Sequence, residues 1–371
     1  MTTQTSVIHD IGYKPYTGPR LGRRQILRAL YVHSLRSVFG FGRGPRAKIV
    51  PFFVALVLLL PAALNVYASS AGKSLVLIPD HMGYNLFLFP VLFVAVAAPE
   101  LVSRDLRHHT LPLYFARPLR RGDYPLAKVL ALVTALFMVE FLPILVTFLG
   151  QLASDKSGHQ IWLDGKADFP AVYVAVFQAV LFSTISLLIA STTGRRVIAT
   201  GVIAILFLVT TAVSHVMTDV VGKNWQNHSV SCVEPTVTQA QAQAFNGPVF
   251  GSGPGGGGNG GGIAVEQLCP GFDFNNDNIN NIDISPDAGR TGYADITLSY
   301  QTPVYSMIAK AGAMVNPVDT IEGSRIWIFH STDNQIPNPS PIGPLYAAEL
   351  LVLILATSGG LFLRYRKVSV S

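Results

Sequence analysis

The sequence predicts an all-α integral membrane protein that crosses the bilayer six times and carries a large exterior loop between the fifth and sixth helices. Half of the 371 residues are hydrophobic and only 13% are charged, which is typical of membrane proteins and unusual for soluble enzymes. Most Lys and Arg residues lie in short segments on one side of the predicted membrane, so the net charge of +6 follows topology. We therefore expect membrane lipid, and no nucleic acid, as a partner.

The N-terminal segment, residues 1–48, carries many basic side chains against a single acid, Asp10. We expect this segment to stay in the cytoplasm. From Leu21 to Phe39 apolar residues recur at helical spacing, which predicts an amphipathic helix lying on the inner leaflet. A solvated basic arm is the alternative, but it would not need the apolar stripe.

Six apolar runs predict the membrane spans, because each is near the roughly 20 residues that cross a bilayer as a helix. The runs are Ile49–Ala68, Met82–Val102, Val129–Leu149, Ala171–Ala190, Val197–Met217 and Leu345–Leu363. The chain then divides into a cytoplasmic N-terminus (1–48), five helices (49–217), an exterior loop or domain (218–344), a sixth helix (345–363) and a cytoplasmic tail (364–371). The alternative, five spans with one apolar run buried in a soluble core, would place a basic segment outside the cell. We expect a multi-pass protein of the cell (inner) membrane with both termini in the cytoplasm.

The connection Pro99–Lys128, between the second and third spans, holds six basic residues against three acids. A short loop this basic should face the cytoplasm. Its apolar residues are too few to form a core and suit docking onto another protein. Judged on charge alone, the positive-inside rule explains these basic residues better than docking onto a partner does.

A motif runs through this connection. It consists of Pro99, Glu100, Leu101, Ser103, Arg104, Asp105, Leu111, Leu113, Tyr114, Ala116, Arg117, Pro118, Leu119, Arg121, Tyr124 and Lys128. The motif resembles the loop of type-2 permeases of ATP-binding-cassette (ABC) exporters, which carries a short coupling helix that rests on the ATPase subunit. The resemblance places the coupling loop at residues 103–124. It implies an ATPase-coupling role for Glu100, Arg104, Asp105, Arg107, Leu111, Leu113, Tyr114, Arg117 and Arg121.

The same resemblance extends to two other segments. The amphipathic N-terminal helix is similar to the interfacial elbow helix of these permeases. The short apolar segment Pro303–Val315 is similar to the re-entrant helices that family members place on the outer side before the last span.

The resemblance implies a permease subunit that exports an unidentified substrate and works as a homodimer or paired with a second permease. The sequence contains no G-x-x-x-x-G-K-[ST] phosphate loop, so we expect ATP and Mg²⁺ to bind to a separate ATPase chain and this chain not to be an enzyme. The alternative is a membrane-anchored exterior binding or assembly protein, in which residues 218–344 do the work without transport.

The two cysteines of the chain, Cys232 and Cys269, both lie in the exterior segment and flank the Gly-rich linker Gly251–Gly262. In an oxidising compartment we expect them to form a disulfide. Two unpaired thiols are the alternative.

An Asn- and Asp-rich stretch after Cys269 places oxygen side chains at the alternating positions of a calcium loop. The candidate ligands are Asp273, Asn275, Asp277, Asn281 and Asp283. However, Asn278 stands where such loops carry Gly, and Ile284 where they carry Glu. A solvated turn without metal is the alternative.

Glu140 lies near the middle of the third predicted span, where an ionisable group is costly and usually faces protein or a wet cavity. It either lines a substrate path or packs in protonated form against a neighbouring helix. The fourth span offers polar side chains as hydrogen-bond partners, namely Gln178, Ser183, Thr184 and Ser186.

Overall fold

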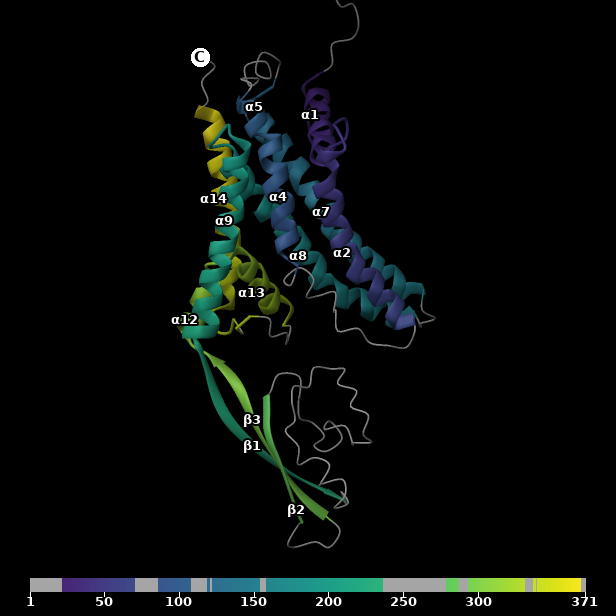
Figure 1. Cartoon of the computed structure of the whole chain (residues 1–371), viewed down its shortest axis with the longest axis vertical. Helices are drawn as coiled ribbons and strands as arrows, with labels where there is room; N and C mark the ends of the chain where they lie inside the picture. The colour runs from purple at the N-terminus through teal and green to yellow at the C-terminus, as the bar shows by residue number, and fades with distance from the viewer. Residues whose placement is uncertain are drawn as a thin grey trace, which may run out of the picture.

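The computed structural model is a long helical bundle with a β-sheet projecting from one end (Figure 1). It describes residues 22–70, 86–107, 119–120, 122–153, 158–235, 278–286, 293–330, 336–337 and 339–367. We call the end of the bundle that carries α1, α5 and the turn between α8 and α9 the basic end, and the opposite end the strand end.

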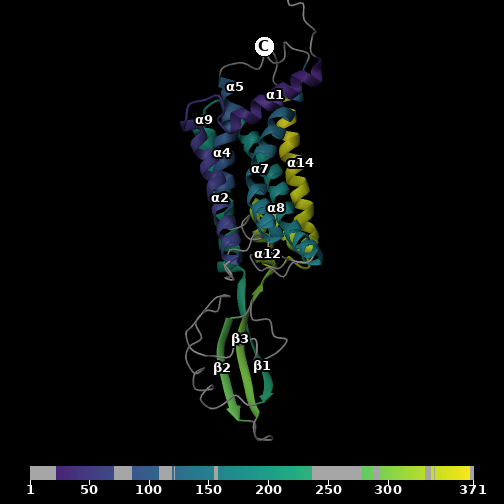
Figure 2. The same cartoon turned by 90° about the vertical axis from the view of Figure 1, so that its right-hand side faces the viewer.

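The described helices account for most of the chain. They are α1 (Arg23–Val38), α2 (Arg46–Ser70), α4 (Leu88–Leu101), α5 (Ser103–Arg107), α7 (Asp123–Ala153), α8 (Gly158–Ala190), α9 (Arg196–His215), the π-helix η2 (Val216–Val221), α12 (Met307–Ala313), α13 (Pro317–Phe329) and α14 (Gly343–Lys367). The long helices run between the basic end and the strand end, side by side in both views (Figures 1 and 2).

Five of these helices are long and apolar enough to cross a membrane. The segments are Arg46–Ala68, Asp123–Ala153, Asp168–Ala190, Arg196–Val221 and Gly343–Arg366. Large apolar side chains on them stay exposed, for example Leu56 and Leu355, as expected of faces that contact lipid. The helices match five of the six predicted spans and fit a multi-pass membrane protein.

The second predicted span, Met82–Val102, differs from the other five. Its helix α4 is described from Leu88 to Leu101, about 21 Å at the α-helical rise, and most of its residues are buried by α2, α7, α8 and α9. Residues 82–85 lie outside the described part of the chain. The apolar run therefore contributes a central helix that is covered mostly by protein, and hydropathy alone does not distinguish contact with protein from contact with lipid.

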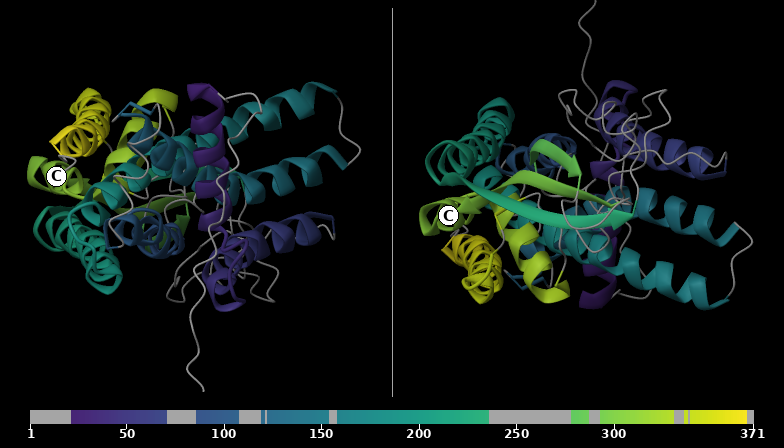
Figure 3. Two further views of the ribbon diagram at one scale, coloured as in Figure 1. Left: turned by 90° about the horizontal axis from the view of Figure 1, so that it is seen from above. Right: turned by 90° about the horizontal axis from the view of Figure 1, so that it is seen from below.

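Helix α1 lies across the basic end, transverse to the bundle (Figures 2 and 3). The predicted helix is present, and its apolar stripe packs on protein, whereas its position on the inner leaflet stays a prediction. Leu30 and Val38 are buried in the main hydrophobic core, and the Tyr31 hydroxyl donates to Thr134 Oγ1 of α7 at 3.1 Å. The apolar stripe of α1 packs on α7 and α4, and this contact removes its apolar side chains from solvent.

The predicted exterior loop contains a three-stranded antiparallel sheet, which corrects the all-α prediction for this part of the chain. The strands are β1 (Lys223–Pro235), β2 (Asn278–Pro286) and β3 (Tyr293–Tyr305), in the order β1-β3-β2. β1 and β3 pair from Lys223 opposite Tyr305 to Pro235 opposite Tyr293, a ribbon of about 40 Å at the usual rise per residue. The sheet leaves the strand end of the bundle along its long axis (Figure 2).

Two short helices connect the sheet to α14. The predicted re-entrant segment, Pro303–Val315, includes the end of β3 and then α12. The more deeply buried helix is the next one, α13, which begins with Asn316 as its N-cap and Pro317 in its first turn. Asn316 Oδ1 accepts a hydrogen bond from the Val318 amide at 3.2 Å, the usual way to satisfy a free helical N–H.

Gly323 lets α13 approach α14 closely, because a Cβ at this position would overlap the ring of the buried Tyr346. We predict that Gly323→Ala destabilises the protein by about 1–3 kcal/mol through overpacking, measured by thermal unfolding in detergent. Gly359→Ala on α14 is the control, since a Cβ there meets nothing within 4 Å. Equal melting temperatures for the two variants would contradict the close packing.

Candidate coupling surface and buried polar helix

Glu100 joins three segments at the basic end. It lies near the end of α4, its side chain is 9% exposed, and it forms ion pairs with Arg43 and with Arg196. Arg43 lies between α1 and α2 and also donates to Ser37 Oγ at 2.7 Å, whereas Arg196 is the first residue of α9. A buried carboxylate shared by two guanidinium groups holds these three segments together.

Asp105 of α5 makes a second junction. Its Oδ2 accepts a hydrogen bond from the Tyr124 hydroxyl at 2.7 Å and lies 3.0 Å from Lys128 Nζ. Lys128 is itself 4% exposed, and the Tyr124 ring packs on the ring of Tyr365 in α14 with centroids 5.1 Å apart. Asp105 therefore links α5 to α7, and through Tyr124 to α14.

Asp123, the first residue of α7, makes a third junction. Arg23 of α1 donates to both of its carboxylate oxygens, at 2.7 and 2.5 Å, and the Arg120 amide donates to Oδ2 at 2.9 Å. The hydrogen bonds with Asp123 raise the pKa of the Arg23 guanidinium. Helix α1 is thereby fixed to the start of α7.

Two hydrogen bonds from side chains to backbone carbonyls attach the end of α8 and the turn that follows it to α5 and α14. Ser103 Oγ of α5 donates to the Ala190 carbonyl at 2.9 Å. Arg364 Nε of α14 donates to the Ser191 carbonyl at 2.7 Å. Together with the contacts of the three acids, these bonds cross-link the elements of the basic end, and we call this set of polar contacts the basic-end network.

The residues predicted to couple to an ATPase fall into three groups. Glu100 and Asp105 belong to the basic-end network, so they contact their own chain and position the loop. Arg107 ends α5 with an exposed side chain, and Arg104 lies in α5 with its side chain outside the described part. Outside the described residues lie Leu111, Leu113, Tyr114, Arg117 and Arg121, whose coupling role stays a prediction.

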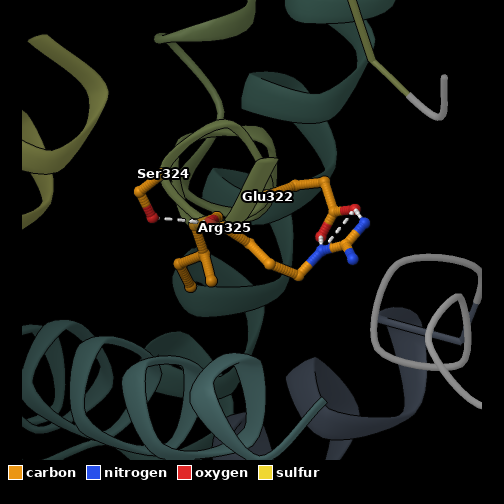
Figure 4. Close-up of polar contacts among 4 residues, drawn as sticks. Glu322, Ser324 and Arg325 are labelled. Atoms are coloured by element: carbon orange, nitrogen blue, oxygen red, sulfur yellow. Dashed lines mark hydrogen bonds and ion pairs between the residues drawn. The ribbon is translucent and has the colours of Figure 1, made fainter. Parts of the chain in front are cut away.

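Helix α13 carries a buried ion pair at the strand end (Figure 4). Arg325 Nη2 lies 2.5 Å from Glu322 Oε1, and Arg325 Nε lies 3.1 Å from both carboxylate oxygens. The two side chains are only 2% and 3% exposed. On the same helix, Ser324 Oγ lies 3.0 Å from the Tyr173 hydroxyl of α8, which attaches α13 to the bundle.

A second acid of α13, Asp319, anchors this helix to α9. Ser214 Oγ, near the end of α9, donates to Asp319 Oδ2 at 2.5 Å, and Asp319 is 4% exposed. Sequence reasoning missed this helix because hydropathy is low there. Two signals were present: the Asn316-Pro317 start of a helix, and charged residues spaced three apart, at 319, 322 and 325, which share a helical face.

Glu140 is buried in α7, 8% exposed, and within the described residues neither of its carboxyl oxygens has a hydrogen-bond partner. The hydrogen bond to α8 that one of the two alternatives would use is not formed among the described residues. Thr184 instead accepts from Thr357 of α14 at 2.9 Å. The side-chain nitrogen of Gln178 also has no partner among the described residues, nor do the hydroxyls of Ser183 and Ser186.

A comparison with protein families identifies the family of this chain. A family model described as ABC-2 family transporter protein matches residues 27–272. The chain belongs to the ABC-2 transporter family. The family suggested by the connection Pro99–Lys128 is confirmed, and the match runs from within α1 to beyond the end of β1. Curated proteins and solved structures yield no match to the chain.

Membership of the ABC-2 family defines the general role of the chain. It is the membrane component of an ABC transporter and is not itself catalytic. Members of the ABC-2 family normally work with an ABC ATPase subunit. The absence of a phosphate loop in the sequence agrees with this division of labour.

Two predicted features of this ABC-2 family member lie wholly or partly outside the described residues. Cys232 is on β1 opposite Ile296 of β3, but Cys269 is not described, so the disulfide stays a prediction. Asn281 and Asp283 lie on β2. The other candidate calcium ligands, Asp273, Asn275 and Asp277, are not described, so the calcium site also stays a prediction.

Replacing Glu100 should loosen the basic-end network. We predict that Glu100→Gln lowers the unfolding free energy by about 1–2 kcal/mol, because two guanidinium groups lose their shared carboxylate and one of them is partly solvated. Asp219→Asn is the control, since Asp219 is 40% exposed and pairs with His215. Thermal unfolding that finds Glu100→Gln no less stable than the control would contradict the role given to Glu100.

The ion pair of α13 should behave as a unit. We predict that Glu322→Gln and Arg325→Met each destabilise the protein by about 3–5 kcal/mol, because each leaves a buried group without its partner. The double variant should lose less than the sum of the single losses. Additive losses in chemical unfolding would show that the two side chains act independently.

Proposed function

We propose that this ABC-2 family member is the permease subunit of an exporter driven by a separate ATPase that docks at the basic end. The observation that carries the proposal is the basic-end network. Because Glu100, Asp105 and Asp123 each join different elements, a displacement of the loop between α5 and α7 is passed to α1, α4, α7, α9 and α14 together. The ATPase binds ATP with Mg²⁺ and supplies that displacement.

The orientation that we propose puts the basic end, and with it both termini, in the cytoplasm. Exposed basic residues gather there, as the positive-inside rule requires; among the described residues they include Arg24, Arg28, Arg36, Arg107 and Arg195. The sheet and α12 then lie outside. Contact of the loop's basic side chains with acidic groups of the ATPase would give the association its specificity.

A path for substrate is supported by polar groups buried within the bundle. Glu140 lacks a hydrogen-bond partner in the described part of the chain, and α13 brings three more charged residues into the strand end. Intramembrane charges of this kind mark transport pathways more often than they serve stability. Two chains together would enclose a wider path than the helices of one, so we propose a dimer, either of this chain or with a second permease.

The test is co-expression with an ABC ATPase encoded beside this chain. We predict that Arg117→Glu and Arg121→Glu each reduce ATPase co-purification by roughly tenfold or more, because reversing a charge replaces an attraction with a repulsion. Arg24→Glu, at an exposed position on α1, is the control and should co-purify as the wild type does.

Three results would contradict the proposal. Normal association and transport by both loop variants would mean that these charges only mark topology. ATP hydrolysis by the purified chain alone would place the catalytic site in this chain. A wild-type chain that associates with no ATPase would favour an exterior binding or assembly protein.

A further inference from the structure

A groove opens at the basic end between α4, α5 and the start of α9. It has a volume of about 1130 Å³ and is lined in part by Val96, Arg107, Arg195, Arg196, Val197 and Gly201. The membrane-spanning segment of α9 begins at Arg196. The groove is therefore placed where the apolar part of the bundle meets its charged end.

The groove carries uncompensated positive charge. The side chains of Arg107 and Arg195 are exposed, and neither has an ion-pair partner within the described residues. Arg196 is different, because it is ion-paired with Glu100, whose carboxylate it shares with Arg43. Two guanidinium groups at one end of an apolar groove match a phosphodiester, which guanidinium binds with two parallel hydrogen bonds.

The wall beside these arginines is apolar and open. Val197 is 85% exposed and Ile198 is 47% exposed, and both belong to the first turn of α9. Further along the same helix, a Cβ on Gly201 would meet nothing within 4 Å. This wall has room for hydrocarbon chains next to the charged end.

We propose that this groove binds an anionic phospholipid, with Arg107 and Arg195 on its phosphate and the wall of α9 against its acyl chains. The proposal rests on the orientation given above, in which the basic end meets the inner leaflet, and it does not depend on the ATPase. An anionic headgroup is favoured because each basic residue near a membrane surface attracts anionic lipid.

A second groove at the basic end provides the comparison. It has a volume of about 620 Å³ and is lined by His33, Arg36, Ser37, Phe41, Gly42 and Arg43. Arg43 is ion-paired with Glu100, which it shares with Arg196, so Arg36 is the arginine of this groove without an ion pair among the described residues. The first groove therefore carries more free positive charge, and Arg36 is a control position at the same end of the bundle.

The experiment is native mass spectrometry of the full chain, purified in detergent without ATPase, during titration with lipid. Phosphatidylglycerol should bind more tightly than phosphatidylcholine with the same acyl chains. The Arg107→Gln/Arg195→Gln variant should weaken phosphatidylglycerol binding by roughly 25-fold, about fivefold per arginine. Arg36→Gln should stay within about twofold of the wild type. Gly201→Leu should also weaken binding, because it fills the groove without changing charge.

Several outcomes would overturn the proposal. Equal binding of the two lipids, or unchanged binding by the double variant, would mean that the arginines do not select a headgroup. Wild-type affinity in Gly201→Leu would mean that the acyl chains lie elsewhere. Displacement of phosphatidylglycerol by inorganic phosphate would identify a site for free anions. Because no ATPase is present, failure of ATPase docking would leave these measurements unchanged.

Discussion

The basic end of this protein depends on one shared carboxylate, that of Glu100. Arg43 brings the connection between α1 and α2 to it, and Arg196 brings the start of α9. Burial makes the carboxylate costly unless both partners stay in place, so the three segments are constrained to move together. Asp105 and Asp123 extend the constraint to α5, α7, α14 and α1. This constraint supports our proposal that a displacement of the loop between α5 and α7 is passed to the bundle as a whole.

Much of this architecture could be predicted from the sequence, because the signals of membrane spans and of cytoplasmic loops are summed over many residues. Five predicted spans coincide with helices that are long and apolar enough to cross a membrane, and the family suggested by the residues between Pro99 and Lys128 is confirmed. The hydropathy pattern did not predict whether each apolar residue contacts lipid or protein. The stripe of α1 and the helix α4 both pack on protein, and a leucine reads the same in sequence whether lipid or protein covers it.

The features that the sequence analysis missed depend on distant parts of the chain. Helix α13 is polar in sequence, yet it is buried by α8, α9 and α14. Its Asp319 accepts a hydrogen bond from Ser214, and its Glu322 and Arg325 form an ion pair. The strand β3 alternates Ile296, Leu298 and Tyr300 with polar residues, a weak period-two signal whose partners lie far away in sequence. Glu140 also has no hydrogen-bond partner on α8 among the described residues, because helix rotation sets such contacts and hydropathy does not report it.

The central claim is that an ATPase meets the basic end of the bundle. Photo-crosslinking tests it directly, with a benzoylphenylalanine in place of the exposed Arg120 in the coupling loop or of the exposed Met307 on α12 at the strand end. The account predicts a crosslink to the co-expressed ATPase from position 120 and none from position 307. A crosslink from position 307, or none from position 120 in an active complex, would contradict it.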